Sequence, residues 1–499
     1  MSAAIASAHP VLRAWPQSQR DTLPLALWDA RAIAAATGGI ASTGFEASGV
    51  EMDSRDVKPG DVFVALKGDA MDGHRFIPMA FEKGAVAAIT DRPVDYPHVQ
   101  VADTMQALHA LAHAARDRSE AKRIAVTGSV GKTGVKEAIF TSLDRASRGA
   151  AHRSVRSYNN HVGVPLSLAR MPARARYGVF EMGMNHAGEI APLADHVRPH
   201  VAIITTIAPA HIENLGSIEA IADEKAQIFT GLLPGGTAII PADLPETERL
   251  IGHARDCGVE IVTFGRSKSA DVRLLDAIAG PHGGSLITAD LGETRLCYTI
   301  AEPGEHWVAN SLAVMAAVRA CGGDLASAGL ALAEMGGLKG RGARHEIAVP
   351  GRPKSAKALL IDESYNANPA SMRATLRSLG QTPAHRRIAV LGAMKELGDF
   401  SDRFHAQLTE PLAEAQIDHV ILVGAEMRAL ADRLAAQSGK APKDVLGKQA
   451  SFDHCSGPDE AIAALSAFGL MQGDVVLVKG SNSVGLGKLV NHFTRAPTK

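Results

Sequence analysis

The sequence has almost no excess of charge, because its 52 lysine and arginine residues are balanced by 53 acidic ones, for a formal net charge of -1 at pH 7. This balance gives no indication of a partner that is nucleic acid or an acidic membrane. No apolar run approaches the roughly 20 residues that span a bilayer. The first twenty residues also lack the apolar core and cleavage site of a signal peptide. We expect no membrane insertion and a cytoplasmic location.

Cysteine is also scarce, and it shows neither paired nor zinc-type spacing. The four cysteines are Cys257, Cys297, Cys321 and Cys455. This usage suits a reducing compartment. What is present is an ordinary globular composition, 46% hydrophobic and 21% charged, over 499 residues. One hydrophobic core rarely serves a chain of this length, so we expect several domains.

Three blocks follow one another along the chain. Residues 1–101 carry short apolar runs such as DVFVAL and AVAAIT between Gly, Pro and Asp clusters, which predicts a small N-terminal α/β domain. Residues 102–342 alternate strand-like runs with helical patterns, which predicts a mainly parallel sheet covered by helices. Residues 343–499 repeat this alternation in ALLIDES, RIAVLGAM, HVILVGAE and DVVLVKG, which indicates a C-terminal Rossmann-like α/β domain. The predicted fold class is α/β with three domains.

A glycine-rich loop, GSVGKT, stands between an expected strand, RIAV, and an expected helix, KTGVKEAIFTSL. Backbone amides in such a loop, together with the helix dipole, bind phosphate oxygens. The Lys132 ammonium would neutralise the β- and γ-phosphates, and the Thr133 hydroxyl would ligate Mg²⁺. The pattern GxxxxGK[ST] is not met, because Val126 stands at its first glycine, and this points away from ordinary P-loop GTPases and kinases. The expected contacts of the loop with a nucleotide are Gly128, Ser129, Val130, Gly131, Lys132 and Thr133.

Three ionisable residues of the same block carry further chemistry. Glu181 ends the run YGVFEMG, where a carboxylate suits Mg²⁺, although an acid in this place is more often a helix cap or an ion-pair partner. His211 follows the run VAIITTIA, and a lone histidine there is usually structural. Lys225 falls in the apolar stripe of a helix that Ser217 can cap. An inward-facing lysine reaches water, pairs with a carboxylate or loses its charge by desolvation.

Together these features resemble the Mur ligase family, ATP-dependent enzymes that join amino acids or peptides to a carboxylate. The shortened loop GxxGKT is similar to the family's phosphate loop, with Gly134 and Val135 in place of further threonines. The stretch NHAGEI resembles the segment that follows the family's Mg²⁺-binding glutamate. In the family, the lysine at this spacing after the histidine is typically carbamylated, near a second Mg²⁺. The resemblance implies catalytic roles for Lys132, Glu181, His211 and Lys225, with two Mg²⁺ ions held by Thr133, Glu181, His211 and carbamylated Lys225.

Further segments resemble the family's contacts with ATP. GEHWVANSLAVMAAV is similar to the segment whose asparagine, here Asn310, contacts adenine. KGRGARHEI looks like the junction whose arginine, here Arg341, contacts the phosphates. In LIDESYNANPASM an acidic residue near the start is expected to bind ribose, and that role falls on Asp362 or Glu363. The resemblance thus places ATP between the second and third blocks.

The segment LIDESYNANPASM, together with SYNNHVGVPLSL and LGAMKELGDFS, resembles the members of the family that add D-alanyl-D-alanine. Residues 53–90 are similar to the part of these ligases that binds the uridine diphosphate end of their substrate. VLVKGSNSVGLGKL resembles their terminal KGS segment, near the incoming dipeptide. The expected substrate contacts are Asp53, Ser54, Arg55, Lys67, Gly68, His74, Asn159, Asn160, Asn366, Asn368, Lys479 and Ser481.

The resemblance implies an ATP-dependent ligase that adds D-alanyl-D-alanine to UDP-N-acetylmuramoyl-tripeptide through an acyl phosphate, in cytoplasmic peptidoglycan precursor synthesis. It also implies a monomer. One alternative is another ligase of the family, which adds a diamino acid, or a folylpolyglutamate synthase. An alternative from a different class is an ATP-switched binding protein without ligase activity. The acidic, histidine and lysine residues near the loop argue against it, since a switch does not require a second metal site.

Overall fold

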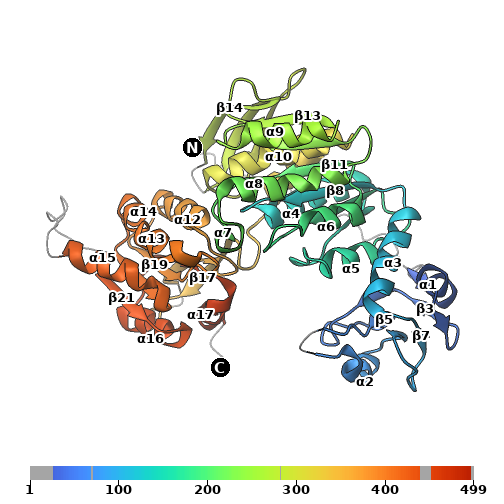
Figure 1. The fold of residues 1–499 in the computed structure, drawn as a ribbon. Coiled ribbons are helices and arrows are strands. Elements are labelled where there is room, and N and C mark those ends of the chain that lie inside the picture. The colour runs from blue at the N-terminus through green and yellow to red at the C-terminus, as the bar shows by residue number, and fades with distance from the viewer. Residues whose placement is uncertain (1–25, 69–70, 281–282, 354, 439–450, 496–499) are drawn as a thin grey trace, which may run out of the picture. The chain divides into compact units, whose positions relative to one another are not determined.

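The computed structural model of the chain (Figure 1) describes residues 26–68, 71–280, 283–353, 355–438 and 451–495. The chain divides into two compact units, residues 1–111 and 112–499. The first twenty residues, in which we expect no signal peptide, lie outside the described residues. Within the described part, no helix has both the length and the apolar character needed to cross a membrane.

The first unit is built on a five-stranded sheet with the order β2–β7–β6–β5–β4. Its strands are β2 (Ile40–Ala41), β4 (Gly49–Glu51), β5 (Asp61–Val64), β6 (Ala87–Thr90) and β7 (His98–Gln100). The strands from β4 to β7 are parallel, and only β2 pairs antiparallel. Short helices accompany them, α1 (Ala30–Thr37) and α2 (Ile77–Glu82), and β1 (Trp28–Asp29) and β3 (Glu46–Ala47) form a separate ladder. The carboxyl ends of β4, β5 and β6 therefore share one edge of the sheet.

Helix α3 (Thr104–Asp117) leads into the second unit, which begins with a nine-stranded sheet in the order β16–β15–β14–β13–β12–β11–β8–β10–β9. Its strands are β8 (Lys122–Thr127), β9 (Ala151–Arg153), β10 (Tyr177–Glu181), β11 (Val201–Ile204), β12 (Thr237–Pro241), β13 (Glu260–Gly265), β14 (Val272–Ala279), β15 (Ser285–Asp290) and β16 (Arg295–Ile300). Neighbouring strands from β9 across to β14 are parallel, as expected. Strands β15 and β16 add an antiparallel edge that the sequence pattern did not indicate.

Helices cover both faces of this sheet. One face carries α4 (Lys132–Ser147), α10 (Glu305–Ala320) and α11 (Leu325–Glu334), and the other carries α5 (Gly163–Ala169), α6 (Ile190–Val197), α8 (Ile218–Ala226) and α9 (Thr247–Asp256). Along β8, Ile124 and Val126 face the first group, whereas Ala125 faces the second, because side chains alternate along a strand. Burial of both faces explains the continuous apolar runs of the sequence.

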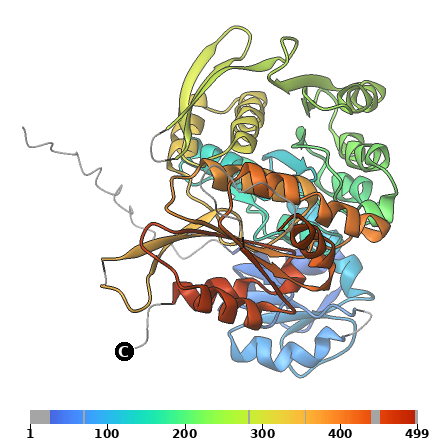
Figure 2. The ribbon, with the colours of Figure 1, turned by 90° about the vertical axis from the view of Figure 1, so that its left-hand side faces the viewer.

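A six-stranded sheet follows, in the order β17–β18–β22–β19–β20–β21. Its strands are β17 (Ala343–Ala348), β18 (Lys357–Glu363), β19 (Arg387–Gly392), β20 (His419–Val423), β21 (Ser451–Cys455) and β22 (Val475–Lys479). All neighbours are parallel except β17 and β18. The helices on its two sides, seen in Figure 2, are α12 (Pro369–Gln381), α13 (Ser401–Ala406), α14 (Thr409–Glu414) and α15 (Arg428–Ser438) against α16 (Pro458–Phe468) and α17 (Gly487–Thr494). This arrangement confirms the expected Rossmann-like sheet.

Each of the expected ranges 1–101, 102–342 and 343–499 contains one of the three large sheets. The nine-stranded sheet ends at Ile300, and the six-stranded sheet begins at Ala343. Because residues 112–499 form one compact unit, the division between the second and third ranges stays a prediction.

Candidate active site

The GSVGKT loop joins the carboxyl end of β8 to α4, as expected. Gly131 caps α4 with a φ of 89°, a left-handed conformation that glycine adopts without strain. The segment after β11 holds the loop, because the Thr205 hydroxyl donates to the Val130 carbonyl at 2.5 Å and the Ser129 hydroxyl to the Ala208 carbonyl at 2.9 Å. The first amides of α4 have no acceptor within the helix, so they are donors suited to phosphate oxygens.

Lys132 is the first residue of α4, and its Nζ donates to the Gly128 carbonyl at 2.7 Å. Burial lowers the pKa of Lys132, while the Glu181 carboxylate opposes this effect and Arg341 adds to it. A phosphate in the loop would stabilise the charged ammonium, because an opposite charge at short range favours the protonated form.

Glu181 is the last residue of β10 and is completely buried. Because β10 pairs with β8, its carboxyl end lies next to the phosphate loop. The Oε2 atom of Glu181 accepts from the Thr133 hydroxyl at 2.8 Å, and its Oε1 accepts from the Asn159 amide at 2.9 Å. A carboxylate and a hydroxyl in contact form a pair of hard oxygen donors, and this donor set fits Mg²⁺.

Lys136 lies one turn further along α4 and was missed by the sequence analysis. Its side chain is completely buried, and its Nζ donates to the carbonyls of Ser154 at 3.0 Å and Arg156 at 2.7 Å. The same ammonium is 3.0 Å from Glu137 Oε1 and 3.8 Å from Glu181 Oε2. It therefore ties α4 to the segment after β9 and places a cation beside Glu181. The signal that could have identified it is a lysine on the buried face of the amphipathic helix.

His211 precedes the short helix α7 (Ile212–Leu215) and adopts a φ of 60°. Its Nδ1 contacts Glu396 Oε2, from the segment after β19. The contact holds the pKa of Glu396 below its usual range. Because Glu396 contacts Nδ1, a metal-binding role for His211 would fall to its other ring nitrogen, Nε2.

Lys225 lies on α8 with only 1% of its surface exposed, so the inward position expected from the sequence is confirmed. Ser217 caps the helix, as expected, by accepting from the Ala220 amide at 3.1 Å. Burial lowers the pKa of Lys225 well below its usual value, and the nearby Lys132 adds to this effect. Glu224 opposes it, but both Glu224 oxygens accept from backbone amides at the start of α6. A neutral amine at Lys225 suits reaction with carbon dioxide.

In the described residues, no three or more histidine, cysteine or carboxylate side chains gather as a metal site. The expected Mg²⁺ ligands include the Thr133 hydroxyl and a modified Lys225, which are groups of a different kind. The oxygen donors of Thr133 and Glu181 fit the first ion, whereas the second depends on the modification of Lys225.

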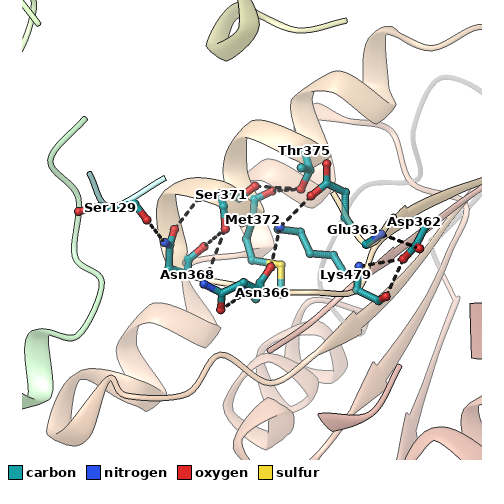
Figure 3. Close-up of polar contacts among 12 residues, drawn as sticks. Ser129, Asp362, Glu363, Asn366, Asn368, Ser371, Met372, Thr375 and Lys479 are labelled. Carbon is teal, nitrogen blue, oxygen red and sulfur yellow. Dashed lines mark hydrogen bonds and ion pairs between the residues drawn. The ribbon is translucent and has the colours of Figure 1, made fainter. Parts of the chain in front are cut away.

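The two acids considered for ribose binding have different surroundings. Asp362 is buried, and its carboxylate accepts from the Gly340 amide at 2.9 Å and from both the amide and the hydroxyl of Ser364, at 3.1 and 2.6 Å. Glu363 points toward Lys479, whose Nζ is 3.4 Å from Glu363 Oε2 (Figure 3). Asp362 thus fixes the local backbone, while Glu363 faces the cavity described below.

Arg341 extends between the two sheets of the second unit. Its Nη2 donates to the Ser157 hydroxyl at 3.1 Å, and its guanidinium lies 4.2 Å from the centre of the Tyr365 ring. Neither Ser157 nor Tyr365 was identified from the sequence, because a loop serine and a half-exposed tyrosine carry no pattern of their own. Their contacts hold the guanidinium beside the phosphate loop.

Several amides and hydroxyls expected to bind substrate are engaged within the protein. Asn368 caps α12 by accepting from the Ser371 amide at 2.9 Å, and its Nδ2 donates to the Ser129 carbonyl at 3.3 Å (Figure 3). Asn160 accepts from the first amide of α5 at 2.9 Å. Ser481 accepts from the Lys395 amide at 3.0 Å. These contacts give each side chain a structural role, and its contact with substrate stays a prediction.

One cavity of about 250 Å³ brings most of the expected residues together. Thr133, Asp362, Asn160, Ser481 and Lys225 do not line it, and neither does Gly128. The expected residues that line it are Ser129, Val130, Gly131, Lys132, Asn159, Glu181, His211, Asn310, Arg341, Glu363, Asn366, Asn368 and Lys479.

In the first unit, the expected substrate contacts follow β4 and β5 at their shared edge. Asp53 and Arg55 pair with each other, with Nη2 2.7 Å from Oδ2. Ser54 is buried, and its hydroxyl lies 3.3 Å from the sulfur of Met79. Lys67 and Gly68 are exposed. Among these side chains, the exposed cations are Arg55, which is paired with Asp53, and Lys67.

His74 was expected to contact substrate, but both of its ring nitrogens are engaged. Nδ1 is 2.6 Å from Asp72 Oδ1, and Nε2 is 3.1 Å from Asp91 Oδ1. Arg92 contacts both aspartates. The His74 amide and ring hold the pKa of Asp72 far below its usual range. His74 thus connects the loop after β5 to the end of β6.

Comparison with known proteins agrees with this geometry. The sequence matches the catalytic domain of the Mur ligase family over residues 46–121, the Mur ligase middle domain over residues 126–318, and the glutamate ligase domain of Mur ligases over residues 352–482. Each of the three matches overlaps one of the three large sheets.

The UDP-N-acetylmuramoyl-tripeptide--D-alanyl-D-alanine ligase of Rickettsia prowazekii (strain Madrid E) is 32% identical over 487 residues, which covers 94% of this chain and 100% of the relative. A crystal structure of MurF from Acinetobacter baumannii matches with a TM-score of 0.78 at 30% identity, covering 95% of this chain and all of that one. The MurF ligase from Thermotoga maritima in complex with ADP matches with a TM-score of 0.71 at 26% identity, covering 89% and 97%. The chain therefore belongs to the Mur ligase family.

Proposed function

We propose that the protein is an ATP-dependent ligase that joins D-alanyl-D-alanine to the terminal carboxylate of UDP-N-acetylmuramoyl-tripeptide in peptidoglycan precursor synthesis. The observation that carries the proposal is the cluster at the start of α4, where Lys132 and Glu181 line one cavity with Arg341 and Glu363, and the buried Thr133 hydroxyl donates to Glu181. Relatives that carry this activity by name support it over almost the whole chain. The cytoplasmic location and the monomeric state stay predictions.

A free carboxylate resists attack by an amine, because its negative charge repels the nucleophile and oxide is a poor leaving group. Transfer of the γ-phosphoryl group of ATP to that carboxylate gives an acyl phosphate and ADP. The amine of D-alanyl-D-alanine then attacks the acyl carbon, and inorganic phosphate leaves as the amide forms. The amine loses one proton in this step.

The electrostatic problem is the approach of two anions, and the residues of the cavity address it. The Lys132 ammonium would neutralise the β- and γ-phosphates, and Arg341, from the segment just before β17, would contact the phosphates. Asn159 would orient the Glu181 carboxylate through the hydrogen bond to Oε1. Bound Mg²⁺, held by Thr133 and Glu181 and, for a second ion, by His211 and carbamylated Lys225, would supply further charge neutralisation.

Carbamylation of Lys225 is supported by its environment. The reaction joins the neutral amine to carbon dioxide, with loss of one proton, and converts a cation into a carboxylate-like anion. Burial favours the neutral amine at Lys225, and its neighbour Glu224 is committed to the amides that begin α6. We assign the ribose contact to Glu363, because Asp362 is occupied by backbone amides and a serine hydroxyl.

The test is product formation. The purified protein, ATP, Mg²⁺, UDP-N-acetylmuramoyl-tripeptide and D-alanyl-D-alanine should give a product whose mass equals both substrates minus water, together with ADP and phosphate. With ¹⁸O in the tripeptide carboxylate, one labelled oxygen should appear in the released phosphate. A diamino acid or glutamate as the preferred amine would identify a different ligase of the family. Partner binding with no amide product would identify an ATP switch.

Two variants connect this activity to the cluster. Glu181→Gln keeps the shape but removes the charge, so turnover should fall at least a hundredfold, while Glu248→Gln on the exposed face of α9 should match the wild type. Lys225→Ala should lose activity and regain part of it when short carboxylates are added. Lys132→Ala should also lose activity, but added carboxylates should not restore it, because this variant lacks a cation. Full activity of Lys225→Ala without added carboxylate would exclude the carbamate.

A further inference from the structure

Trp307 lines the cavity, and neither the sequence analysis nor the proposed mechanism gives it a role. It is the third residue of α10 and is 9% exposed. It lines the cavity beside the phosphate loop and also a smaller adjoining cavity that contains Glu302 and Glu363. The ring of Trp307 is thus part of the wall of both cavities.

The ring reaches the loop because α4 has a glycine where it passes. A Cβ atom at Gly134 would lie 2.9 Å from Trp307 Cη2, which is closer than van der Waals contact allows. Three residues earlier, a Cβ atom at Gly131 would lie 3.0 Å from Asn310 Oδ1. Gly131 thus faces Asn310 and Gly134 faces Trp307. Within each helix the two residues are one helical turn apart, so α10 packs closely against the start of α4. The indole is thereby held against the helix whose first amides receive phosphate.

The other end of the nucleotide has a limited choice of position. The proposed function puts the γ-phosphate near Glu181, because Glu181 and the Thr133 hydroxyl that donates to it are the expected Mg²⁺ donors. The base must then extend away from Glu181. Apart from the loop and β10, the residues that line the cavity include His306, Trp307 and Asn310 from the start of α10, and His306 and Trp307 also line the adjoining cavity with Glu363.

The chemistry of this wall suits a flat heteroaromatic ring. The centres of the His306 and Trp307 rings are 6.4 Å apart, and the rings are tilted by 47°. Burial lowers the pKa of His306 to about 4, and the nearby Lys479 acts in the same direction, so this ring is uncharged at neutral pH. Indole offers the largest stacking surface among the side chains, and stacking of a base on it grows with the size of the base.

We propose that Trp307 stacks on the nucleotide's base and selects a purine, and that Gly134 is required because it admits the indole ring beside the phosphate loop. The inference rests on the proposed use of ATP, and it adds a residue that determines specificity. It concerns binding of the base only, so it can be tested without the tripeptide or the dipeptide.

The test compares ligands with and without a base by calorimetry in the presence of Mg²⁺. The ligands are ADP, CDP and tripolyphosphate, and the proteins are the wild type, Trp307→Phe and Trp307→Leu. We expect Trp307→Leu to weaken ADP binding about tenfold, to reduce the preference for ADP over CDP, and to change tripolyphosphate affinity less than twofold. Trp307→Phe should lie between the two. Equal loss for ADP and tripolyphosphate would mean that the ring merely supports the loop, and unchanged ADP binding would remove the ring from the site; either result overturns the proposal.

Gly134→Ala tests the second half of the inference. In the wild-type background the added methyl group should displace the indole and weaken ADP binding severalfold. In the Trp307→Leu background the same change should have little effect, because the ring it displaces is gone. An equal effect in both backgrounds would overturn the role assigned to Gly134. Failure of the ligase reaction with intact purine selectivity would instead refute the proposed function alone.

Discussion

Replacement of the buried Lys136 by methionine tests how the segment after β9 is held at the site. Methionine has a similar length and no charge, so Lys136→Met removes the ammonium with little change in volume. The variant loses the hydrogen bonds to the carbonyls of Ser154 and Arg156, at 3.0 and 2.7 Å, and the ion pair with Glu137. The Glu181 carboxylate, 3.8 Å away, also loses a neighbouring cation.

The magnitude follows from what each partner retains. Breaking a buried ion pair by removing one partner costs roughly 3–5 kcal/mol. Glu137 keeps Arg153 at 3.0 Å, and Glu181 keeps its two hydrogen-bond donors, so we expect the lower end, about 3 kcal/mol in the free energy of unfolding. The two carbonyls would also lose their donor, which should loosen residues 154–157 and with them the Ser157 contact to Arg341.

The measurement combines urea unfolding with hydrogen exchange followed by mass spectrometry. Lys136→Met should lower the free energy of unfolding by about 3 kcal/mol. It should also speed amide hydrogen exchange in residues 151–160 and raise the KM for ATP. Lys122→Met, an exposed lysine at the start of the neighbouring β8, should change stability by less than about 0.5 kcal/mol. If Lys136→Met matched the Lys122→Met control in both measurements, the ammonium would not hold this segment.

Three further outcomes follow from individual contacts. Burial raises the pKa of Glu302 from 4.5 to about 7, while Arg344 opposes this effect and Glu363 adds to it. Between these two pH values the folded protein keeps a proton that the unfolded chain releases, so stability falls as the pH rises, by roughly 3 kcal/mol in all at about 1.36 kcal/mol per pH unit. Glu302→Gln should flatten this dependence of stability on pH, measured by urea unfolding. His74→Ala removes the buried ring that contacts Asp72 and Asp91 and leaves Arg92 as their shared partner, so it should destabilise the first unit by roughly 1–3 kcal/mol, seen as faster exchange in residues 71–92. Lys67→Ala should instead raise the KM for the uridine substrate without that change in exchange. Glu396→Gln removes the negative charge that faces His211 but keeps an acceptor, and the pair is partly exposed, so hydrogen exchange in residues 211–216 should rise no more than about fivefold. No rise at all would show that the charge of Glu396 does not restrain α7.

The sequence predicted well those elements that have a strong period and a recognisable boundary. The strand–loop–helix unit around Lys132 was expected because an apolar run, glycines and a 3.6-residue stripe follow one another, and Val135, Ala138, Ile139 and Leu143 are all buried. The Ser217 cap was expected from a local rule and is confirmed. The antiparallel edge of residues 272–300 was not, because its pairing depends on contacts that no local pattern records.

The roles of individual polar residues were harder to predict, because one side chain can serve two purposes. Asn160 and Asn368 were expected to bind substrate, yet each accepts from backbone amides at the start of a helix, as asparagine commonly does. For Asp362 and Glu363 the sequence left the choice open, and only the hydrogen bonds of Asp362 separate the two. Trp307 could not have been identified, since its contact with Gly134 joins residues far apart in the chain.

The contacts that join the two sheets of the second unit involve residues expected to bind ligands. Asn368 donates to the Ser129 carbonyl of the phosphate loop, Arg341 donates to Ser157, and Glu396 pairs with His211. In each pair at least one member is expected to touch ATP, a metal or a substrate. A nucleotide that fills the cavity must therefore interact with both sheets at once, and it stabilises whichever arrangement of them it contacts best.

The residues after β18 and β19, near which the dipeptide is expected to bind, belong to the same contacts. Binding of ATP and of the dipeptide should thus be thermodynamically coupled, each raising the affinity of the other by the same factor, which paired calorimetric titrations can measure.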